Sequence, residues 1–128
     1  LLETFIGDGL LISTNTGSTA YNVSLGGSII SKDLLALSLT PIAPLKNKIY
    51  HSLSNPLIVS HKQTIRITPK NKNLVITLDG MNHELEDVIK IEAKIGNKKI
   101  KRLKLEDTNF IKIIRDKILG NEKEGRDL

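Results

Sequence analysis

The stretch "TIRITPKNKNLVITLDG", residues 64–80, indicates the fold class. Residues 64–68 and 74–78 are short segments in which apolar and polar side chains alternate, and a turn rich in Pro, Lys and Asn separates them. Alternation over so few residues at such close spacing is typical of antiparallel strands. We therefore predict antiparallel sheet, arranged as two packed layers.

The rest of the chain is consistent with this prediction. The 128 residues fit one domain, and the apolar set is mostly Leu, Ile and Val, with two Tyr, two Phe and no Trp. Such a composition favours strands. The predicted fold class is mainly β: an antiparallel β-sandwich of two stacked sheets, with a short helix after the T-G-S-T-A-Y loop and a C-terminal helix. Further strands are expected at residues 1–6 and 10–12, which form a hairpin over residues 1–13, and at 34–39, 57–59, 88–93 and 99–105.

A short helix is expected over residues 20–25. Ser18 or Thr19 is its predicted N-cap, because a hydroxyl there accepts a hydrogen bond from an otherwise unpaired amide. Two glycines at residues 26–27 end the helix. Pro41 and Pro44 then predict a stiff loop, since the ring of proline fixes its backbone angle.

A second helix is expected near the end of the chain, with Asp107 or Thr108 as its cap and Gly120 at its end. Four apolar side chains recur at helical spacing and form one stripe: Phe110, Ile113, Ile114 and Ile118. Residues 1–120 are therefore expected to form one domain. The charged residues 121–128 are expected to be a flexible tail.

Composition argues against several functional classes. The net charge is +5, but the densest basic run, residues 98–104, lacks the interleaved aromatics on which bases stack, so nucleic acid is not expected as a partner. No apolar run is long enough for a bilayer, and no signal peptide precedes the domain, so membrane association is not expected. The chain contains no Cys, which suits a reducing compartment, and a cytoplasmic location is expected.

Metal and nucleophile motifs are also missing from the sequence. His51, His61 and His83 are scattered and lack metal-ligand spacing, so no metal site is predicted. There is no G-x-S-x-G nucleophile elbow, no Walker A loop and no G-x-G-x-x-G fingerprint.

The segment "DGLLISTNTGSTAY", residues 8–21, is the strongest candidate for a binding site. It places four hydroxyls and a glycine between a buried strand and a short helix: Thr14, Thr16, Ser18, Thr19 and Gly17. Hydroxyls donate and accept hydrogen bonds, glycine lets a ligand approach the backbone, and unpaired helical amides carry partial positive charge. This pattern predicts a site for a phosphate, a ribose or an amide-bearing ring. The alternative is an ordinary polar loop that caps a helix.

The wider sequence resembles the NAD kinase family. "GDGLLISTNTGSTAYNVSLGGSII", residues 7–30, is similar to its Gly/Thr-rich signature, and "LSLTPIAP" (37–44), "HSLSNPLIV" (51–59) and "ITLDG" (76–80) resemble later family segments. The resemblance implies an N-terminal α/β domain, a C-terminal domain of stacked β-sheets and an active site between them. It also implies a homodimer or tetramer in which a neighbouring subunit completes the dinucleotide site.

The resemblance further implies which residues contact NAD. They are Asp8, Thr16, Thr19, Ala20, Tyr21, Ser24, Ala43 and Leu45. The chain departs from the family pattern at four positions. Asn15 and Ser28 stand where Pro is common, Met81 stands where Gln is frequent, and Ile6 occupies a position that is sometimes basic.

Family members transfer a phosphoryl group from ATP or polyphosphate to the 2′-hydroxyl of the adenosine ribose of NAD. The resemblance implies that the donor and a divalent metal, Mg²⁺, are bound largely outside this chain. It also implies that no catalytic residue lies within the chain, because the G-G-D-G motif with the catalytic base belongs to the N-terminal domain. Two alternatives stay open at the level of sequence: the C-terminal domain of a lipid kinase, and a non-catalytic nucleotide-binding or oligomerisation module.

Overall fold

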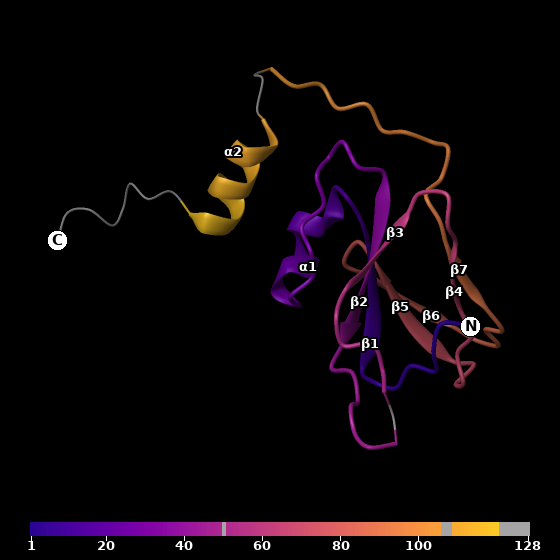
Figure 1. Ribbon diagram of the computed structural model, residues 1–128. Helices are drawn as coiled ribbons and strands as arrows, with labels where there is room; N and C mark the ends of the chain where they lie inside the picture. Colours follow the sequence, from indigo (N-terminus) through magenta and orange to yellow (C-terminus); the bar gives the residue numbers. More distant parts are fainter. Residues whose placement is uncertain (50, 106–108, 121–128) are drawn as a thin grey trace. The chain divides into compact units, whose positions relative to one another are not determined.

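Figure 1 shows the computed structural model, which describes residues 1–49, 51–105 and 109–120. The described chain is mainly β, with antiparallel strands and short helices, and this confirms the predicted fold class. It divides into two compact units, one made of residues 1–61 and 95–128 and the other of residues 62–94. Within the described residues the strands form one sheet of three strands and two sheets of two strands, where two stacked sheets were expected.

The first unit is built around β2 (Ala36–Ile42), the central strand of its sheet. It pairs antiparallel with β1 (Gly9–Thr14) along one edge and with β3 (Leu57–Ser60) along the other. Most of β2 is buried, and its first two residues, Ala36 and Leu37, are with Ile30 the buried apolar residues of the described chain. β2 is thus the buried element that supports the hydroxyl-rich segment at residues 14–24.

The predicted hairpin over residues 1–13 is wrong. Residues 1–6 form no strand, because their backbone groups bond to later loops: the Leu45 N–H donates to the Ile6 carbonyl (2.7 Å), and the Ile6 N–H donates to the Ser52 hydroxyl (3.2 Å). β1 pairs with β2 instead. The pairing partner lies far along the chain, so local turn signals did not identify it.

The expected strand at residues 34–39 lies two residues later and includes Pro41, which is opposite Leu10 on β1. The stiff loop predicted to begin at Pro41 is therefore wrong at that residue. Pro41 lies beyond the part of β2 that pairs with β3, which ends at Leu39. A strand with one neighbour tolerates the missing N–H of proline, because one side of it needs no ladder hydrogen bond.

The second unit contains two separate strand pairs. β4 (Ile65–Ile67) pairs antiparallel with β7 (Ile91–Ala93), and β5 (Leu74–Leu78) pairs antiparallel with β6 (Met81–Leu85). The two alternating segments that indicated the fold class are both strands, as predicted, but they do not pair with each other.

The tight turn between β5 and β6 has a clear chemical cause. Asp79 and Gly80 both have positive φ, 47° and 85°, which is the geometry that Asp-Gly favours in two-residue hairpins. β6 has no counterpart in the sequence prediction, because all five of its residues are exposed and only the two at its ends, Met81 and Leu85, are apolar. The strand expected at 88–93 shortens to β7, and the strand expected at 99–105 does not form.

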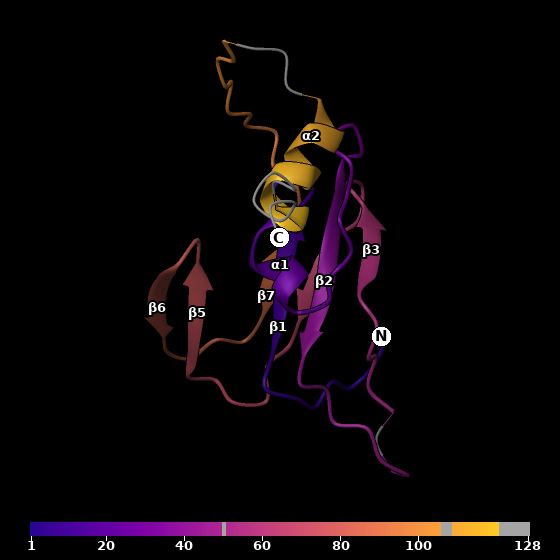
Figure 2. The same ribbon diagram turned by 90° about the vertical axis from the view of Figure 1, so that its left-hand side faces the viewer.

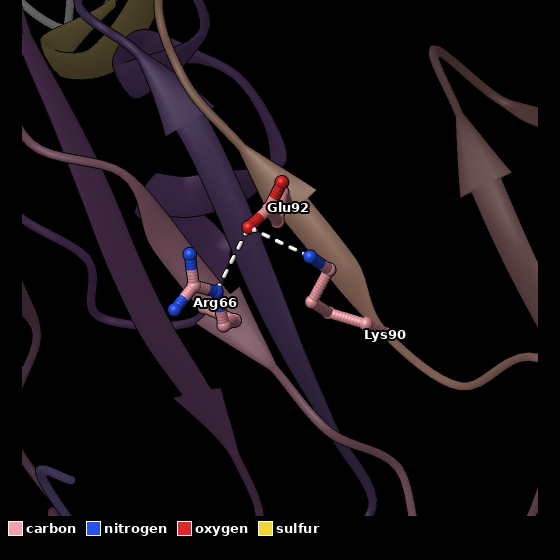
Figure 3. A network of polar contacts seen from close by, with 3 residues as sticks. All are labelled: Arg66, Lys90 and Glu92. Carbon is pink, nitrogen blue, oxygen red and sulfur yellow. Dashed lines mark hydrogen bonds and ion pairs between the residues drawn. The ribbon is translucent and has the colours of Figure 1, made fainter.

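A cross-strand ion network holds β4 and β7 (Figure 3). Arg66 and Glu92 are directly opposite each other, and the Arg66 Nε donates to the Glu92 Oε1 at 2.8 Å. The Lys90 Nζ lies 3.2 Å from the same oxygen. The hydrogen bond from Arg66, followed by the contact with Lys90, holds the pKa of Glu92 below its ordinary value of 4.5.

The polar segment after β1 forms the short helix that was predicted. A 3₁₀ turn, η1 (Gly17–Thr19), leads into α1 (Tyr21–Ser24). The predicted caps Ser18 and Thr19 are wrong, because the N-cap of α1 is Ala20 and no side chain bonds to the helix start. Figures 1 and 2 both show α1 beside β1 and β2.

The C-terminal helix consists of α2 (Phe110–Ile114) and a π-helical turn, η2 (Arg115–Leu119). Asn109 caps it, accepting the Lys112 N–H at 2.8 Å, and the predicted caps at residues 107 and 108 lie outside the described residues. The four residues of the predicted apolar stripe are half-buried, and Gly120 ends the helix with a φ of 72°. The tail at residues 121–128 also lies outside the described residues. None of the helices described is long and apolar enough to cross a membrane.

Candidate functional site

The hydroxyl-rich segment divides into side chains that turn inward and side chains that turn outward. Ser18 belongs to the inward set and is fully buried. Its Oγ donates to the Asn15 carbonyl at 2.7 Å and accepts the Ile30 N–H at 2.9 Å. Both functions of the hydroxyl are used within the protein, so Ser18 closes the loop and is not a ligand contact.

Asn22 is the centre of the inward set, with 1% of its surface exposed. Its Oδ1 accepts the Thr40 hydroxyl at 2.7 Å, which joins α1 to β2. Its Nδ2 donates to the carbonyls of Ser18 (3.2 Å) and Ser28 (3.0 Å). The Thr40 hydroxyl also lies 3.3 Å from that of Ser38. These buried polar contacts fasten α1 to the sheet.

The outward set contains five of the predicted contact residues. All five lie on η1, on α1 or next to them, and Thr19 alone is half-buried while the others are exposed: Thr16, Thr19, Ala20, Tyr21 and Ser24. Tyr21 is 60% exposed, so its ring is accessible to a ligand. These five residues are therefore accessible, or half-accessible in the case of Thr19, within nine consecutive positions of the first unit.

The other three predicted residues gather at the opposite end of β1. The Asp8 N–H donates to the Ile42 carbonyl at 3.0 Å, which places Asp8 beside the end of β2, just before Ala43. Leu45 is bonded to the segment that precedes Asp8. All three side chains are exposed.

Two backbone features at this end are unusual. Ala43 has a φ of 44°, a conformation that costs a residue with a Cβ roughly 1–2 kcal/mol. A Cβ on Gly7 would lie 2.9 Å from the Ala43 carbonyl oxygen, so only glycine permits this close approach. Strained backbone of this kind is found preferentially at functional sites.

The two groups of predicted residues lie along the same strand pair. Asn22 holds α1 against Thr40, and Thr40 is two residues, or about 7 Å, from Ile42 along β2. α1 therefore folds back from the end of β1 toward the Asp8 end. The first unit alone carries all eight predicted residues.

The predicted contact residues carry little negative charge. Asp8 is the one acidic residue among the predicted contacts. Nearby, partial burial and then the charges of Lys104, Arg102 and Lys117 lower the pKa of Lys32. Across the part of the chain that the structure describes, no group of three or more His, Asp or Glu side chains gathers to hold a metal ion.

Sequence reasoning did not identify the roles of Asn22, Thr40 and Gly27. A Cβ on Gly27 would lie 2.0 Å from the Asn22 Oδ1, so this glycine is required by a neighbour and not only by a turn. A buried Asn beside an exposed Tyr leaves no periodic signal in a helix of four residues. The paired glycines 26–27 were the one available clue.

Comparison with known proteins identifies the family. Residues 1–103 match the family described as "ATP-NAD kinase C-terminal domain". This chain belongs to that family. NAD kinase of Lactobacillus johnsonii is 38% identical over 125 residues, which are 95% of this chain and 46% of that protein. "NAD kinase 2" of Bacillus subtilis is 41% identical over 111 residues, 84% of this chain and 42% of the relative.

A solved structure supports the same assignment. Yeast NADH kinase in complex with NADH is similar with a TM-score of 0.55 and 34% sequence identity, over 70% of this chain and 26% of the yeast chain. Membership of the NAD kinase family is thus shown, and the lipid-kinase alternative is not favoured. The chain spans about half the length of the curated NAD kinases that it matches.

Proposed function

We propose that this chain is the NAD-binding, C-terminal part of an NAD kinase that uses ATP or polyphosphate to phosphorylate the adenosine-ribose 2′-hydroxyl of NAD, giving NADP. The observation that carries the proposal is the family match over residues 1–103, which include every predicted contact residue. The likeness to NADH kinase with bound NADH supports a dinucleotide as the ligand. The grouping of exposed residues on η1 and α1 supports the position of the site.

The proposed contacts follow from the chemistry of the side chains. Thr19 and Ser24 supply hydroxyls, and the small side chain of Ala20 lets its backbone approach the ligand. The exposed Tyr21 supplies a ring face on which a base or a nicotinamide stacks, together with a phenol. Asp8 accepts hydrogen bonds from an amide or hydroxyl of the ligand. Thr16, Ala43 and Leu45 complete the surface.

We place the donor phosphates, Mg²⁺ and the catalytic base in the half of the enzyme that precedes this domain in the family. The described residues do not fit a metal site, because no His, Asp and Glu side chains converge there. Phosphoryl transfer needs a positioned donor, a metal and an acceptor for the hydroxyl proton. This chain supplies the binding of the acceptor substrate.

We also propose that the enzyme is a homodimer or tetramer. β6 pairs with β5 only, among the described strands, and several large apolar side chains of this pair are exposed, including Val75, Leu78 and Met81. Exposed apolar surface on an edge pair is typical of an interface. Light scattering on the full gene product tests the assembly. The cytoplasmic location expected from the sequence stays a prediction.

The direct test is an assay of the full gene product that contains residues 1–128. With NAD, Mg²⁺ and ATP, or polyphosphate in a parallel arm, we expect formation of NADP, detected with an NADP-specific dehydrogenase. A lipid alcohol replaces NAD in the control arm and should give no phosphorylated product. Absence of NADP with every donor would refute the proposed function, and phosphorylation of the lipid would restore the alternative.

A further inference from the structure

We propose that Asn22 and Thr40 are positioning residues for NAD, which present Tyr21 and Ser24 to the ligand by locking α1 in one place on β2. This inference rests on the proposed function and deepens it. Neither residue is among the predicted contacts, and both are buried: Asn22 is 1% exposed and Thr40 is 1% exposed.

The side-chain amide of Asn22 bonds to three different segments. The Oδ1 accepts from the hydroxyl of Thr40 on β2 at 2.7 Å, and the Nδ2 donates to the carbonyl of Ser18 on η1 and to that of Ser28 after α1. Both amide protons are therefore used. One holds η1, which precedes α1, and the other holds the segment at Ser28, which follows α1. One side chain thus joins the segment before α1, the segment after it and the central strand.

The helix needs this anchor because it cannot stabilise itself. α1 has four residues, no side-chain cap and no charged residue in its first turn. A single helical turn is unstable alone, because nucleation fixes several backbone angles for one hydrogen bond. Its N-cap Ala20 and its first and last residues, Tyr21 and Ser24, are exposed, so they contribute little packing.

Gly27 restricts the position of the Asn22 side-chain amide. Its missing side chain leaves space that the Asn22 amide occupies, since a Cβ there would lie 2.0 Å from Oδ1 and 2.5 Å from Nδ2. The amide therefore lies against the backbone of Gly27 and accepts a hydrogen bond from Thr40. A small shift of Asn22 would carry Tyr21, its neighbour in sequence, with it.

Thr40 also relates the two halves of the proposed site. It lies on the same strand as Ile42, whose carbonyl accepts the Asp8 N–H at 3.0 Å. β2 thus holds both α1, through Thr40, and Asp8, through Ile42. Loss of the Thr40 hydroxyl should disturb the first group relative to the second.

The test compares Thr40→Val with Thr40→Ser in the full gene product. Valine has nearly the shape of threonine but leaves the Asn22 Oδ1 without its donor, whereas serine keeps the hydroxyl. We expect Thr40→Val to raise KM for NAD about five- to thirty-fold, as for a lost buried hydrogen bond, with KM for ATP unchanged. Thr40→Ser should restore KM for NAD to within about threefold of the wild type.

Thr77→Val is the matched control. Thr77 donates to the Asn82 Oδ1 at 2.7 Å, the same bond between the same residue types, but on the exposed pair β5–β6. This variant should leave KM for NAD within about twofold of the wild type. A purely structural effect of Thr40→Val would lower the fraction of active enzyme, hence the apparent kcat, and leave KM for NAD unchanged; that result would overturn the inference.

A double-mutant cycle gives a second reading. If Thr40 acts by presenting Tyr21, then Thr40→Val should raise KM for NAD much less in the Tyr21→Ala background, and full additivity would contradict the inference. Should Thr40→Val not fold, Asn22→Ser is measured in its place; failure of both to fold would show a role in folding and overturn the proposal. NADP formation by the wild type separates these outcomes from failure of the proposed function.

Discussion

Ser13 and Ser18 show how differently two hydroxyls of one segment are used. The Ser18 Oγ donates to one backbone carbonyl and accepts from the Ile30 N–H. The Ser13 Oγ is also buried but has no hydrogen-bond partner. A buried polar group without a partner keeps its full desolvation cost, roughly 1–3 kcal/mol. The two serines should therefore respond to substitution in opposite ways.

We expect Ser18→Ala to lower the free energy of unfolding by about 1–3 kcal/mol, because the buried Ile30 N–H loses its acceptor. Ser13→Ala should leave that free energy unchanged or raise it by up to about 1 kcal/mol. Urea denaturation of the full gene product, followed by circular dichroism, measures both variants. Equal losses of stability would contradict the assignment of Ser18 as the structural hydroxyl.

Tyr21 carries the sharpest prediction about ligand binding. Tyr21→Ala should weaken NAD binding by about 1–3 kcal/mol, if the ring stacks as aromatics do on bases. Tyr21→Phe keeps the ring and should retain most of the affinity. Because the side chain is 60% exposed, neither change should much alter stability. Calorimetric titration with NAD measures the effect, and an unchanged isotherm for the alanine variant would remove Tyr21 from the site.

At the scale of elements, the pairing of β4 with β7 should depend on pH. The folded-state pKa of Glu92 is lowered, so its contribution is present above the ordinary pKa of glutamate and is lost as the pH falls through the lowered value. We expect Glu92→Gln to be less stable than the wild type at neutral pH and equal to it in acid. Urea midpoints at several pH values measure this, and the difference should shrink in high salt because the network is exposed.

Glu84→Gln is the control for this prediction. It removes the same charge from β6, an exposed strand of the same unit. Its stability relative to the wild type should vary with pH less than that of Glu92→Gln. The same pH dependence in both variants would assign the effect to net charge and not to the contact with Arg66.

Elements were predictable from the sequence where their cause is local. The alternation at residues 64–68 and 74–78, and the helical stripe that begins at Phe110, identified β4, β5 and α2. The pairing of β1 with β2 was not predictable, since the paired residues lie 23 to 33 positions apart in the chain and no local turn joins them. β6 gives no signal because neither of its faces is buried.

The candidate site was predictable in part for the same reason. Its signature at residues 7–30 is contiguous, so the resemblance identified the family that the comparisons then showed. Which hydroxyl turns inward was not evident, because that depends on contacts such as Asn22 with Thr40, 18 residues apart. The contact residues themselves stay predictions.

At the scale of the whole molecule, we expect residues 1–128 alone to form no NADP from NAD, ATP and Mg²⁺. The reason is that we place the catalytic base and the donor site outside this chain, which spans about half of its relatives. The full gene product under the same conditions should form NADP. Robust turnover by the 128 residues alone would show that a base lies within them and that our placement is wrong.

The close approach of Gly27 to Asn22 restricts how this surface can be re-engineered or can drift in evolution. A side chain at position 27 would occupy the volume of the amide at position 22, so a library that randomises position 27 by itself should return only glycine. Larger residues become accessible after position 22 has been reduced in size. We therefore expect position 22 to change before position 27. The intermediate would have α1 no longer fastened to β2, and it would bind NAD more weakly.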